Sequence, residues 1–410
     1  MKFFNTDGIR ARALDLICSN LCLRLGQVLG KRSKKILIGY DTRISSPQIV
    51  DLLINGIVTQ GADMEVLGVM PTPMMSFLLP RHPADYGIVV TASHNPYYDN
   101  GIKVFASSGE KIDARTIGEI EKQMEEEEKF SLMGNLGKLT YLSYHQEYID
   151  DLNAKIDFQN PHKVVVDLAN GAFSSFQNVL HLDRVDYIHA LPDGRNINDG
   201  VGALYAENLL RYVKENDYDY GFAFDGDGDR LLMVDRKRVY TGDDLLFLLA
   251  CESGADKVAL SVAANRGLVK ELEKRGIETV VTPVGDVHIL SAIREGKAVL
   301  GGEPSGHLLF ADRLYSDAMD SLIRILRILS SKSEIPTFKA YHTFKIDLPA
   351  DHPLYGKREE IERRIGQIRT KDDDLLIRES GTEDVLRVQF QSLSEKRLKE
   401  VGNLFAEEKE

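Results

Sequence analysis

The sequence is poor in cysteine, and its three cysteines do not suggest a disulfide framework. The spacing of Cys18 and Cys22 predicts that they share one face of a single helix as buried apolar thiols. Because no histidine or further cysteine lies near them, the pair is not typical of a metal site. We therefore expect the cysteines to carry no function.

Long hydrophobic runs are also missing. No apolar stretch approaches the roughly 20 residues that a membrane-spanning helix needs. The first ten residues contain Asp7 and Arg10, where a secretory signal would keep its apolar stretch. These absences predict a cytoplasmic protein without a membrane partner.

The chain has too little positive charge for a typical nucleic-acid partner. Its formal net charge is -12, whereas phosphate backbones recruit lysine and arginine surfaces. Neither a Walker A loop nor a Rossmann fingerprint is found, so nucleotide cofactors are disfavoured. No G-x-S-x-G elbow is present either, which disfavours a serine hydrolase of that type.

What the sequence does contain is an alternation of strand-like and helical stretches that repeats three times. At 410 residues the chain should form about three or four domains. A first strand with a polar turn occurs at residues 35–43, 163–171 and 257–267, and a second strand follows at 64–73, 186–194 and 278–286. A third strand, with a loop of unusual composition, arrives at residues 86–96, 220–230 and 298–307.

This repeat predicts an α/β protein with three related α/β domains of mixed sheets. The rhythm breaks near Tyr341, which indicates a smaller C-terminal α+β domain. Ligands bind at the carboxyl ends of strands in open α/β sheets, so the unusual loops should meet around a central cleft. Chance alternation in an ordinary α/β protein is the alternative. The predicted domains are residues 1–140, 141–238, 239–338 and 339–410.

The loop DGDGDR places a carboxylate at every second position, with glycines between that let the backbone curl. Asp225, Asp227 and Asp229 can then point at one centre, and hard oxygen ligands suit Mg²⁺ or Ca²⁺. An EF-hand does not fit, because Arg230 and Arg236 stand where that motif needs glycine and glutamate. An acidic turn that caps a helix is the remaining alternative.

The loop TASHNP places Ser93 directly after an apolar strand, with His94 and Asn95 beside it. A serine hydroxyl needs activation to act as a nucleophile, and it could otherwise simply cap the following turn. If the repeat is real, Ser93 faces the aspartate loop. This equivalence of loops favours phosphoryl chemistry.

Two further loops are rich in polar groups. GEPSGH offers Glu303, Ser305 and His307, which can all hydrogen-bond the hydroxyls of a sugar. RESGTED gathers donors suited to a phosphate dianion, namely Arg378, Ser380, Gly381 and Thr382. An ordinary turn is the alternative for each loop.

Taken together and in this order, the four loops resemble those of the α-D-phosphohexomutase family over nearly the whole chain. The resemblance implies that Ser93 is a phosphoserine and that one Mg²⁺ lies between it and Asp225, Asp227 and Asp229. It also implies a sugar-reading role for Glu303, Ser305 and His307, and a phosphate-binding role for Arg378, Ser380, Gly381 and Thr382. By the same resemblance, Arg10 and Lys103 would flank the phosphoserine. Together with His94 they are the candidates for stabilising its charge and moving the hydroxyl proton, whereas Arg230 could offset part of the aspartate charge and reach a phosphate of the substrate.

The segments NTDGIR, NPYYDNGIK and PDGRNIN resemble the branch of this family that acts on glucosamine phosphates. Pro304, Asp384 and Val287 depart from the residues common in that branch. The expected reaction interconverts glucosamine 6-phosphate and glucosamine 1-phosphate, for amino-sugar nucleotide and cell-wall precursor synthesis. The alternative is a mutase of mannose or glucose phosphates.

Two other classes of protein would use similar residues. A phosphatase would share the nucleophile and the metal but admit water, and a metal- or sugar-binding protein would never carry phosphate on Ser93. The expected partner is a hexosamine phosphate. A homodimer is compatible with the sequence, which does not fix the oligomeric state.

Overall fold

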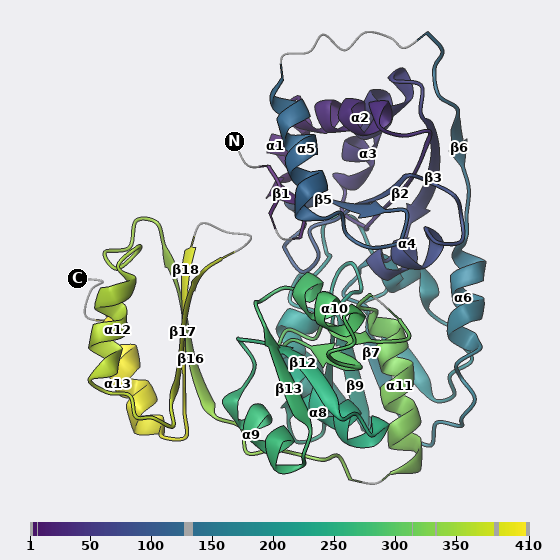
Figure 1. Ribbon diagram of the computed structural model, residues 1–410. Coiled ribbons are helices and arrows are strands. Elements are labelled where there is room, and N and C mark those ends of the chain that lie inside the picture. The colour runs from purple at the N-terminus through teal and green to yellow at the C-terminus, as the bar shows by residue number, and fades with distance from the viewer. Residues whose placement is uncertain are drawn as a thin grey trace. The chain divides into compact units, whose positions relative to one another are not determined.

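The computed structural model describes residues 3–5, 7–126, 134–313, 315–332, 334–380 and 385–406. Its elements group into two compact units (Figure 1). The first unit combines residues 1–245 with 305–335, and the second combines residues 246–304 with 336–410. The four domain boundaries proposed from the sequence stay a prediction.

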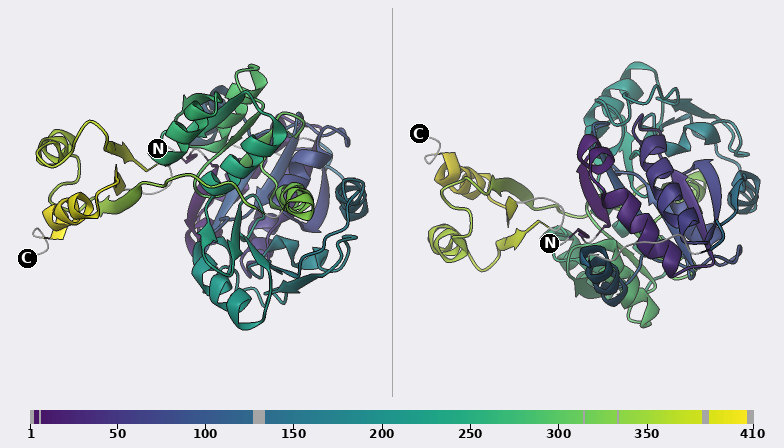
Figure 2. Two further views of the ribbon diagram at one scale, coloured as in Figure 1. Left: turned by 90° about the horizontal axis from the view of Figure 1, so that it is seen from below. Right: turned by 90° about the horizontal axis from the view of Figure 1, so that it is seen from above.

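The first unit opens with a six-stranded mixed sheet of order β1-β5-β4-β2-β3-β6. Its strands are β1 Ile9–Arg12, β2 Lys35–Tyr40, β3 Asp63–Val69, β4 Tyr86–Val90, β5 Asp99–Ala106 and β6 Leu139–Tyr141. The accompanying helices are α1 Ala13–Cys18, α2 Leu21–Lys31, α3 Ser46–Thr59, α4 Thr72–Leu78 and α5 Ala114–Glu125. Helices α2 and α3 lie side by side on one face of this sheet (Figure 2).

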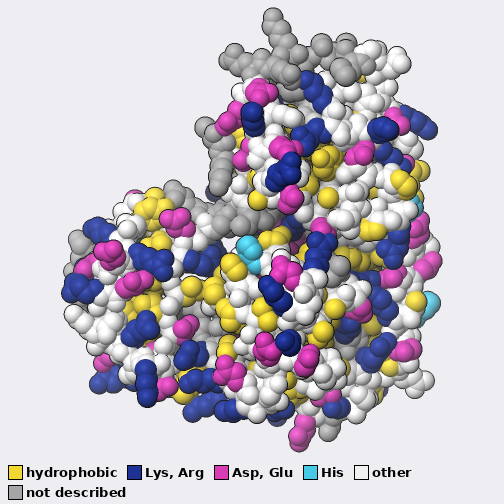
Figure 3. Space-filling view, in the orientation of Figure 1, with side chains coloured by type: hydrophobic (Ala, Val, Ile, Leu, Met, Phe, Trp, Pro, Cys, Tyr) yellow, Lys and Arg dark blue, Asp and Glu magenta, His cyan; other side chains and the backbone are white. Residues whose placement is uncertain are grey.

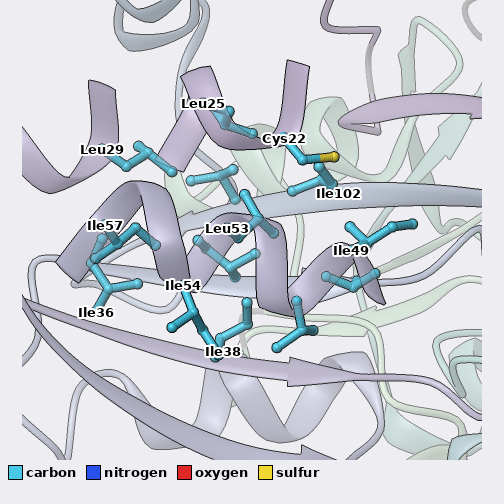
Figure 4. Close-up of a cluster of buried hydrophobic side chains, with 14 of the residues drawn as sticks. Cys22, Leu25, Leu29, Ile36, Ile38, Ile49, Leu53, Ile54, Ile57 and Ile102 are labelled. Atoms are coloured by element: carbon cyan, nitrogen blue, oxygen red, sulfur yellow. The ribbon is translucent and has the colours of Figure 1, made fainter. Parts of the chain in front are cut away.

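An aliphatic core joins α2 and α3 to the first sheet (Figure 4). Leu25 and Leu29 of α2 are fully buried against Leu53 and Ile57 of α3. Such burial contributes roughly 1.5–3 kcal/mol for each large aliphatic side chain, so this core stabilises the sheet whose strand ends carry the polar loops.

A second mixed sheet in the same unit has the order β11-β10-β9-β7-β8. Its strands are β7 Val164–Asp167, β8 Val185–Ile188, β9 Tyr220–Phe224, β10 Leu231–Asp235 and β11 Val239–Tyr240. The unit also holds α6 His145–Asn153, the 3₁₀ turns Ala172–Phe176 and Ala203–Tyr205, α7 Ala206–Glu215, β15 Leu308–Phe310 and α11 Ala318–Ser331. Helix α8 runs over Gly242–Ser253.

The second unit contains three parallel strands of order β13-β12-β14 and a separate antiparallel sheet of order β16-β18-β17. Its elements are β12 Lys257–Ser261, α9 Arg266–Lys274, β13 Glu278–Thr282, α10 Asp286–Arg294, β14 Leu300–Gly302, β16 His342–Pro349, α12 Arg358–Gly366, β17 Asp374–Glu379, β18 Val385–Ser392 and α13 Glu395–Ala406. Helices α12 and α13 cover one face of the antiparallel sheet through a shared apolar core (Figures 1 and 2).

The threefold repeat is visible in the strand pairing. The first strand of each predicted repeat, β2, β7 or β12, pairs in parallel with both the second and the third strand of its own repeat. The polar loops therefore follow equivalent strands, β4, β9 and β14. The prediction of an α/β protein with several mixed sheets and more than one domain is confirmed.

The prediction for the cysteines is wrong in part. Cys18 ends α1 and is exposed, whereas Cys22 lies in the separate helix α2 and is buried. The chain turns at Ser19 and Asn20, which favour turns because their side chains compete for backbone hydrogen bonds. Burial raises the pKa of Cys22 to about 12, so only this thiol is the inert apolar group expected.

In the described part of the chain, no helix has the length and apolar character needed to cross a membrane. On the face drawn in Figure 3, acidic and basic side chains are interspersed.

Candidate active site

Ser93 lies just beyond β4, in a backbone conformation that is unusual for a residue with a side chain. Its φ is +52°, in the left-handed region, and it is fully buried. Such a conformation costs on the order of 1–2 kcal/mol and persists only where surrounding contacts enforce it. One of these contacts is the Ser93 amide, which donates to Thr91 Oγ1 at 2.9 Å.

The main restraint on this loop is Arg43, a fully buried arginine that follows β2. Its guanidinium donates to the carbonyl oxygens of Ser93 at 2.9 Å and Asn95 at 2.8 Å, and also to those of Pro96 and Asp99. Asp41 holds the guanidinium in turn, because Arg43 Nε donates to Asp41 Oδ2 at 2.8 Å. We call Asp41, Arg43 and Thr91 the serine clamp.

The clamp is closed on both sides of the loop. Thr91 donates through Oγ1 to Asp41 Oδ2 at 2.7 Å while it accepts the Ser93 amide. From the segment that follows β8, Asn198 Nδ2 donates to the carbonyl oxygen of Ser93 at 2.9 Å. The amide and the carbonyl of Ser93 are therefore both fixed, which orients its hydroxyl.

We expect Arg43→Lys to loosen the loop. A lysine keeps the charge beside Asp41 but cannot reach four carbonyl oxygens, and buried acceptors left unpaired cost about 1–3 kcal/mol each. Urea denaturation should therefore show a free energy of unfolding lower by about 2–4 kcal/mol. The turnover number should fall at least about tenfold, since misplacement of reacting groups is costly.

Arg12→Lys is the matched control, because Arg12 belongs to the same sheet and its side chain is 60% exposed. It should change neither stability nor turnover measurably. Wild-type unfolding and turnover in Arg43→Lys would contradict the role of the clamp.

The aspartate loop follows β9 in the second sheet. Asp225, Asp227 and Asp229 are buried, and one oxygen from each lies within 4.8 Å of the others. The two residues between them must be glycine, Gly226 because a side chain would collide with its neighbours and Gly228 because of its backbone conformation. A Cβ at Gly226 would lie 2.7 Å from the Ser93 carbonyl oxygen, and Gly228 has φ +73°. The three carboxylates converge, as the alternating pattern predicted.

The serine loop and the aspartate loop meet. Ser93 Oγ donates to Asp225 Oδ2 at 2.6 Å, although the two residues are 132 positions apart. This is the spatial relation on which the phosphoryl interpretation of the sequence depends.

The buried carboxylates are partly balanced by two cations. Lys103, from β5, donates through Nζ to Asp227 Oδ2 at 2.7 Å and to Asp229 Oδ2 at 2.9 Å. Arg230 Nε lies 3.8 Å from Asp225 Oδ2. Burial alone would lower the pKa of Lys103. The negative charges of Asp227 and Asp229 nevertheless raise this pKa well above its usual value, so Lys103 stays charged.

The aspartates differ in their proton affinity. Burial, together with the charges of Asp229 and Asp227, raises the pKa of Asp225 well above its usual value. Burial also acts to raise the pKa of Asp229, but the charges of Lys103, His307 and Arg230 together outweigh burial and lower that pKa to about 2. The cluster thus holds more negative charge than its neighbours offset.

The donor set fits a hard divalent cation. Among the described residues, no hydrogen-bond partner is found for Asp227 Oδ1 or Asp229 Oδ1, although both atoms are buried. Buried carboxylate oxygens without a partner are costly, and a cation would satisfy them. Three converging carboxylates are the ligands that Mg²⁺ accepts with its remaining positions left to water or phosphate.

Arg10 contacts the serine loop, and His94 is part of it. Arg10 donates to Asn95 Oδ1 at 3.1 Å and to Asp7 Oδ2 at 2.5 Å. His94 Nδ1 lies 3.3 Å from Ser93 Oγ. Burial, with the nearby charges of Arg230 and Arg10, lowers the pKa of His94 to about 2, so its ring is neutral.

The predicted sugar loop is divided between the two units. His307 lies in the first unit and accepts from Arg230 Nε at 3.0 Å through Nε2, next to the aspartate loop. Ser305 belongs to the same unit, whereas Glu303 belongs to the second, where its Oε1 accepts from the Gly285 amide at 2.9 Å.

The predicted phosphate loop lies in the second unit, between β17 and β18. The guanidinium of Arg378 folds back onto its own strand, where Nη1 donates to the carbonyl oxygen of Glu379 at 3.2 Å. Burial and the charge of Arg387 lower the pKa of Arg378, although Glu303 opposes them. Ser380 is the last described residue before the loop, and Gly381 and Thr382 lie outside the described residues.

Sequence reasoning missed the residues that hold the serine loop. No role was predicted for the serine clamp or Asn198, although Asp41 and Arg43 directly follow β2, which pairs in parallel with β4 and so ends at the same edge of the sheet as the serine loop. A polar pair directly after a buried strand was the available signal.

Comparison with known proteins identifies the family of the chain. The family description "Phosphoglucomutase/phosphomannomutase, alpha/beta/alpha domain I" matches residues 1–131, and domain III of the same family matches residues 241–343. Phosphoglucosamine mutase of Bacillus subtilis is 34% identical, with 99% of this chain and 98% of that protein aligned.

Solved structures share the fold. A phosphoglucomutase/phosphomannomutase family protein from Burkholderia thailandensis has a TM-score of 0.78 at 22% identity, over 98% of this chain and 95% of its own. The N-acetylphosphoglucosamine mutase of Aspergillus fumigatus, in complex with GlcNAc-6P and magnesium, has a TM-score of 0.68 at 17% identity, over 98% and 94%.

The chain therefore belongs to the α-D-phosphohexomutase family, and it is an enzyme of the isomerase class. Within that family it is most like the phosphoglucosamine mutases, which are 34–35% identical to it over nearly its full length.

Proposed function

We propose that this enzyme interconverts glucosamine 6-phosphate and glucosamine 1-phosphate through a phosphorylated Ser93. The observation that carries the proposal is the contact of Ser93 Oγ with Asp225 Oδ2 at 2.6 Å, beside the cluster of three buried carboxylates. The choice of sugar is supported by the relatives that are named phosphoglucosamine mutases.

The proposed reaction has two transfers of the same kind. The bond between phosphorus and Ser93 Oγ breaks while the free hydroxyl oxygen of the sugar phosphate bonds to phosphorus. The proton of that hydroxyl passes, overall, to the departing Ser93 Oγ, which becomes a free hydroxyl again. The resulting bisphosphate turns around, and its other phosphoryl group returns to Ser93. No water is consumed in either transfer. Because phosphoryl transfer leaves the protein little covalent chemistry to perform, positioning of the reacting groups accounts for most of the catalysis.

The chain's own groups have distinct parts in this scheme. Lys103 and Arg10 are charged and stabilise the negative charge of the transferring group. His94 has a pKa of about 2, so it contributes a neutral hydrogen bond to the serine oxygen rather than charge. Asp225 accepts a hydrogen bond from the free serine hydroxyl and thereby holds the serine oxygen in place.

Asp225, Asp227 and Asp229, together with the phosphorylated Ser93, would hold Mg²⁺. When bound, the ion neutralises charge and polarises the transferring phosphoryl group. Glu303, Ser305 and His307 would bind the sugar hydroxyls. Arg378, Ser380, Gly381 and Thr382 would bind the phosphate that does not react, and Arg230 would contact the substrate beside His307.

A substrate comparison tests the sugar. The purified enzyme, with Mg²⁺ and a trace of the matching bisphosphate, should convert glucosamine 6-phosphate with a kcat/KM at least about tenfold above that for mannose or glucose 6-phosphate. The 1-phosphate product can be followed by ³¹P NMR. If mannose or glucose 6-phosphate is preferred, the mutase of those sugars replaces our proposal, and release of free phosphate without isomerisation would make it a phosphatase.

The proposed setting is the cytoplasm, where the product would enter amino-sugar nucleotide and cell-wall precursor synthesis. The negative net charge argues against a nucleic-acid partner. The homodimer stays a prediction.

A further inference from the structure

Asp227 is oriented from outside its own loop by a residue to which neither the motifs nor the proposed reaction gives a role. Thr72 is the first residue of α4, after the second strand of the first repeat. Its Oγ1 donates to Asp227 Oδ2 at 2.6 Å, and its amide donates to the Asp227 carbonyl oxygen at 2.9 Å. Thr72 therefore grips both the side chain and the backbone of this aspartate.

The contact is buried and is not a by-product of helix capping. Thr72 is 5% exposed and Asp227 is fully buried, so water does not compete for the bond. The cap position of α4 is Pro71, and the start of the helix shows no side-chain capping bond. The hydroxyl of Thr72 is thus directed to the aspartate rather than to the helix.

Two donors converge on one oxygen of Asp227 and leave the other free. Lys103 Nζ also donates to Oδ2, at 2.7 Å, while no partner for Oδ1 is found among the described residues. A carboxylate held in this way cannot rotate without breaking two charge-assisted hydrogen bonds. Asp227 is one of the three buried carboxylates that each bring an oxygen within 4.8 Å of the others.

We propose that Thr72 is a positioning residue for the cation site, which fixes Asp227 so that Oδ1 faces the ion. The inference rests on the proposed metal-binding role of the three aspartates and adds a residue from a different repeat. Groups that hydrogen-bond a metal-ligating side chain typically change metal affinity by about 10–100-fold when removed. Since Lys103 remains on the same oxygen, the lower end of that range is expected.

The test compares Thr72→Val with Thr72→Ser. Valine keeps the shape and loses the hydroxyl, whereas serine keeps the hydroxyl. Manganese(II) serves as the probe, and its free concentration is followed by electron paramagnetic resonance during titration of the whole enzyme. Thr72→Val should bind Mn²⁺ about tenfold more weakly, and Thr72→Ser should bind it as the wild type does.

Two further measurements separate positioning from a structural effect. At saturating Mg²⁺, Thr72→Val should recover most of its turnover, with the KM for the sugar phosphate unchanged. Thr59→Val is the matched control, because Thr59 bonds only to carbonyl oxygens of its own helix, those of Asn55 and Gly56. It should leave Mn²⁺ affinity unaltered.

The outcomes distinguish the two proposals. If the wild type binds Mn²⁺ and Asp227→Ala abolishes binding, but Thr72→Val binds as tightly as the wild type, the role of Thr72 is refuted while the metal site stands. If the wild type and Asp227→Ala bind Mn²⁺ alike, the metal site itself is refuted, and the role of Thr72 with it. A loss of thermal stability in Thr72→Val with unchanged affinity would also overturn the inference.

Discussion

Ser93→Ala is expected to abolish mutase turnover and to leave the protein folded. Removing a nucleophile that forms a covalent intermediate typically lowers kcat by at least about 10³-fold. Turnover is measured with glucosamine 6-phosphate, and intact-mass spectrometry should show that the mass of one phosphoryl group, present in part of the wild-type protein, is missing from the variant.

Ser108→Ala is the control for this experiment. Ser108 follows β5 in the same unit, is exposed, and bonds only weakly to Glu110, at 3.3 Å. Its replacement should keep both the added mass and the turnover. Retention of either property in Ser93→Ala would remove the basis of the proposed mechanism.

Asp225→Asn is expected to have opposite effects on activity and on stability. Asparagine can still accept the hydrogen bond of Ser93, but it removes one of three negative charges that lie within 4.8 Å of one another. Turnover should fall by at least about 10²-fold, because a proposed ligand of the cation loses its charge. The metal-free protein should gain stability on the order of 1 kcal/mol, since the buried charge and its repulsion are gone.

Thermal unfolding with and without Mg²⁺ checks this prediction. In the wild type, Mg²⁺ should raise the Tm by binding the folded state, and in Asp225→Asn this shift should be lost. Asp312→Asn is a matched control, because Asp312 is 67% exposed and pairs with Arg324 at the surface. If metal-free Asp225→Asn is less stable than the metal-free wild type, repulsion among the three carboxylates does not destabilise the protein, and the prediction is wrong.

Most of the fold could be predicted from the sequence because its signals are local. Apolar runs that end in polar turns mark β2, β7 and β12, and the same order of loops recurs after β4, β9 and β14. Local patterns also identified the aspartates and Ser93. Their meeting was expected from the repeat alone, because equivalent strand ends lie at equivalent places in related sheets.

The residues that hold the site could not be predicted in this way. Arg43 donates to carbonyl oxygens, which every residue has, so its targets leave no trace in the sequence. Thr72 meets Asp227 only because two separate sheets come together. The cysteine prediction failed for the opposite reason, since the local break between α1 and α2 overrode a spacing of four residues.

The serine clamp has a consequence for how this site can change. Arg43 binds main-chain carbonyl oxygens, so its hydrogen bonds do not depend on which side chains the serine loop carries. A substitution at His94 can therefore alter the chemistry around the nucleophile without releasing it, whereas a change at Arg43 disturbs every residue of the segment. Anyone who redesigns this site should vary the former position and leave the latter untouched.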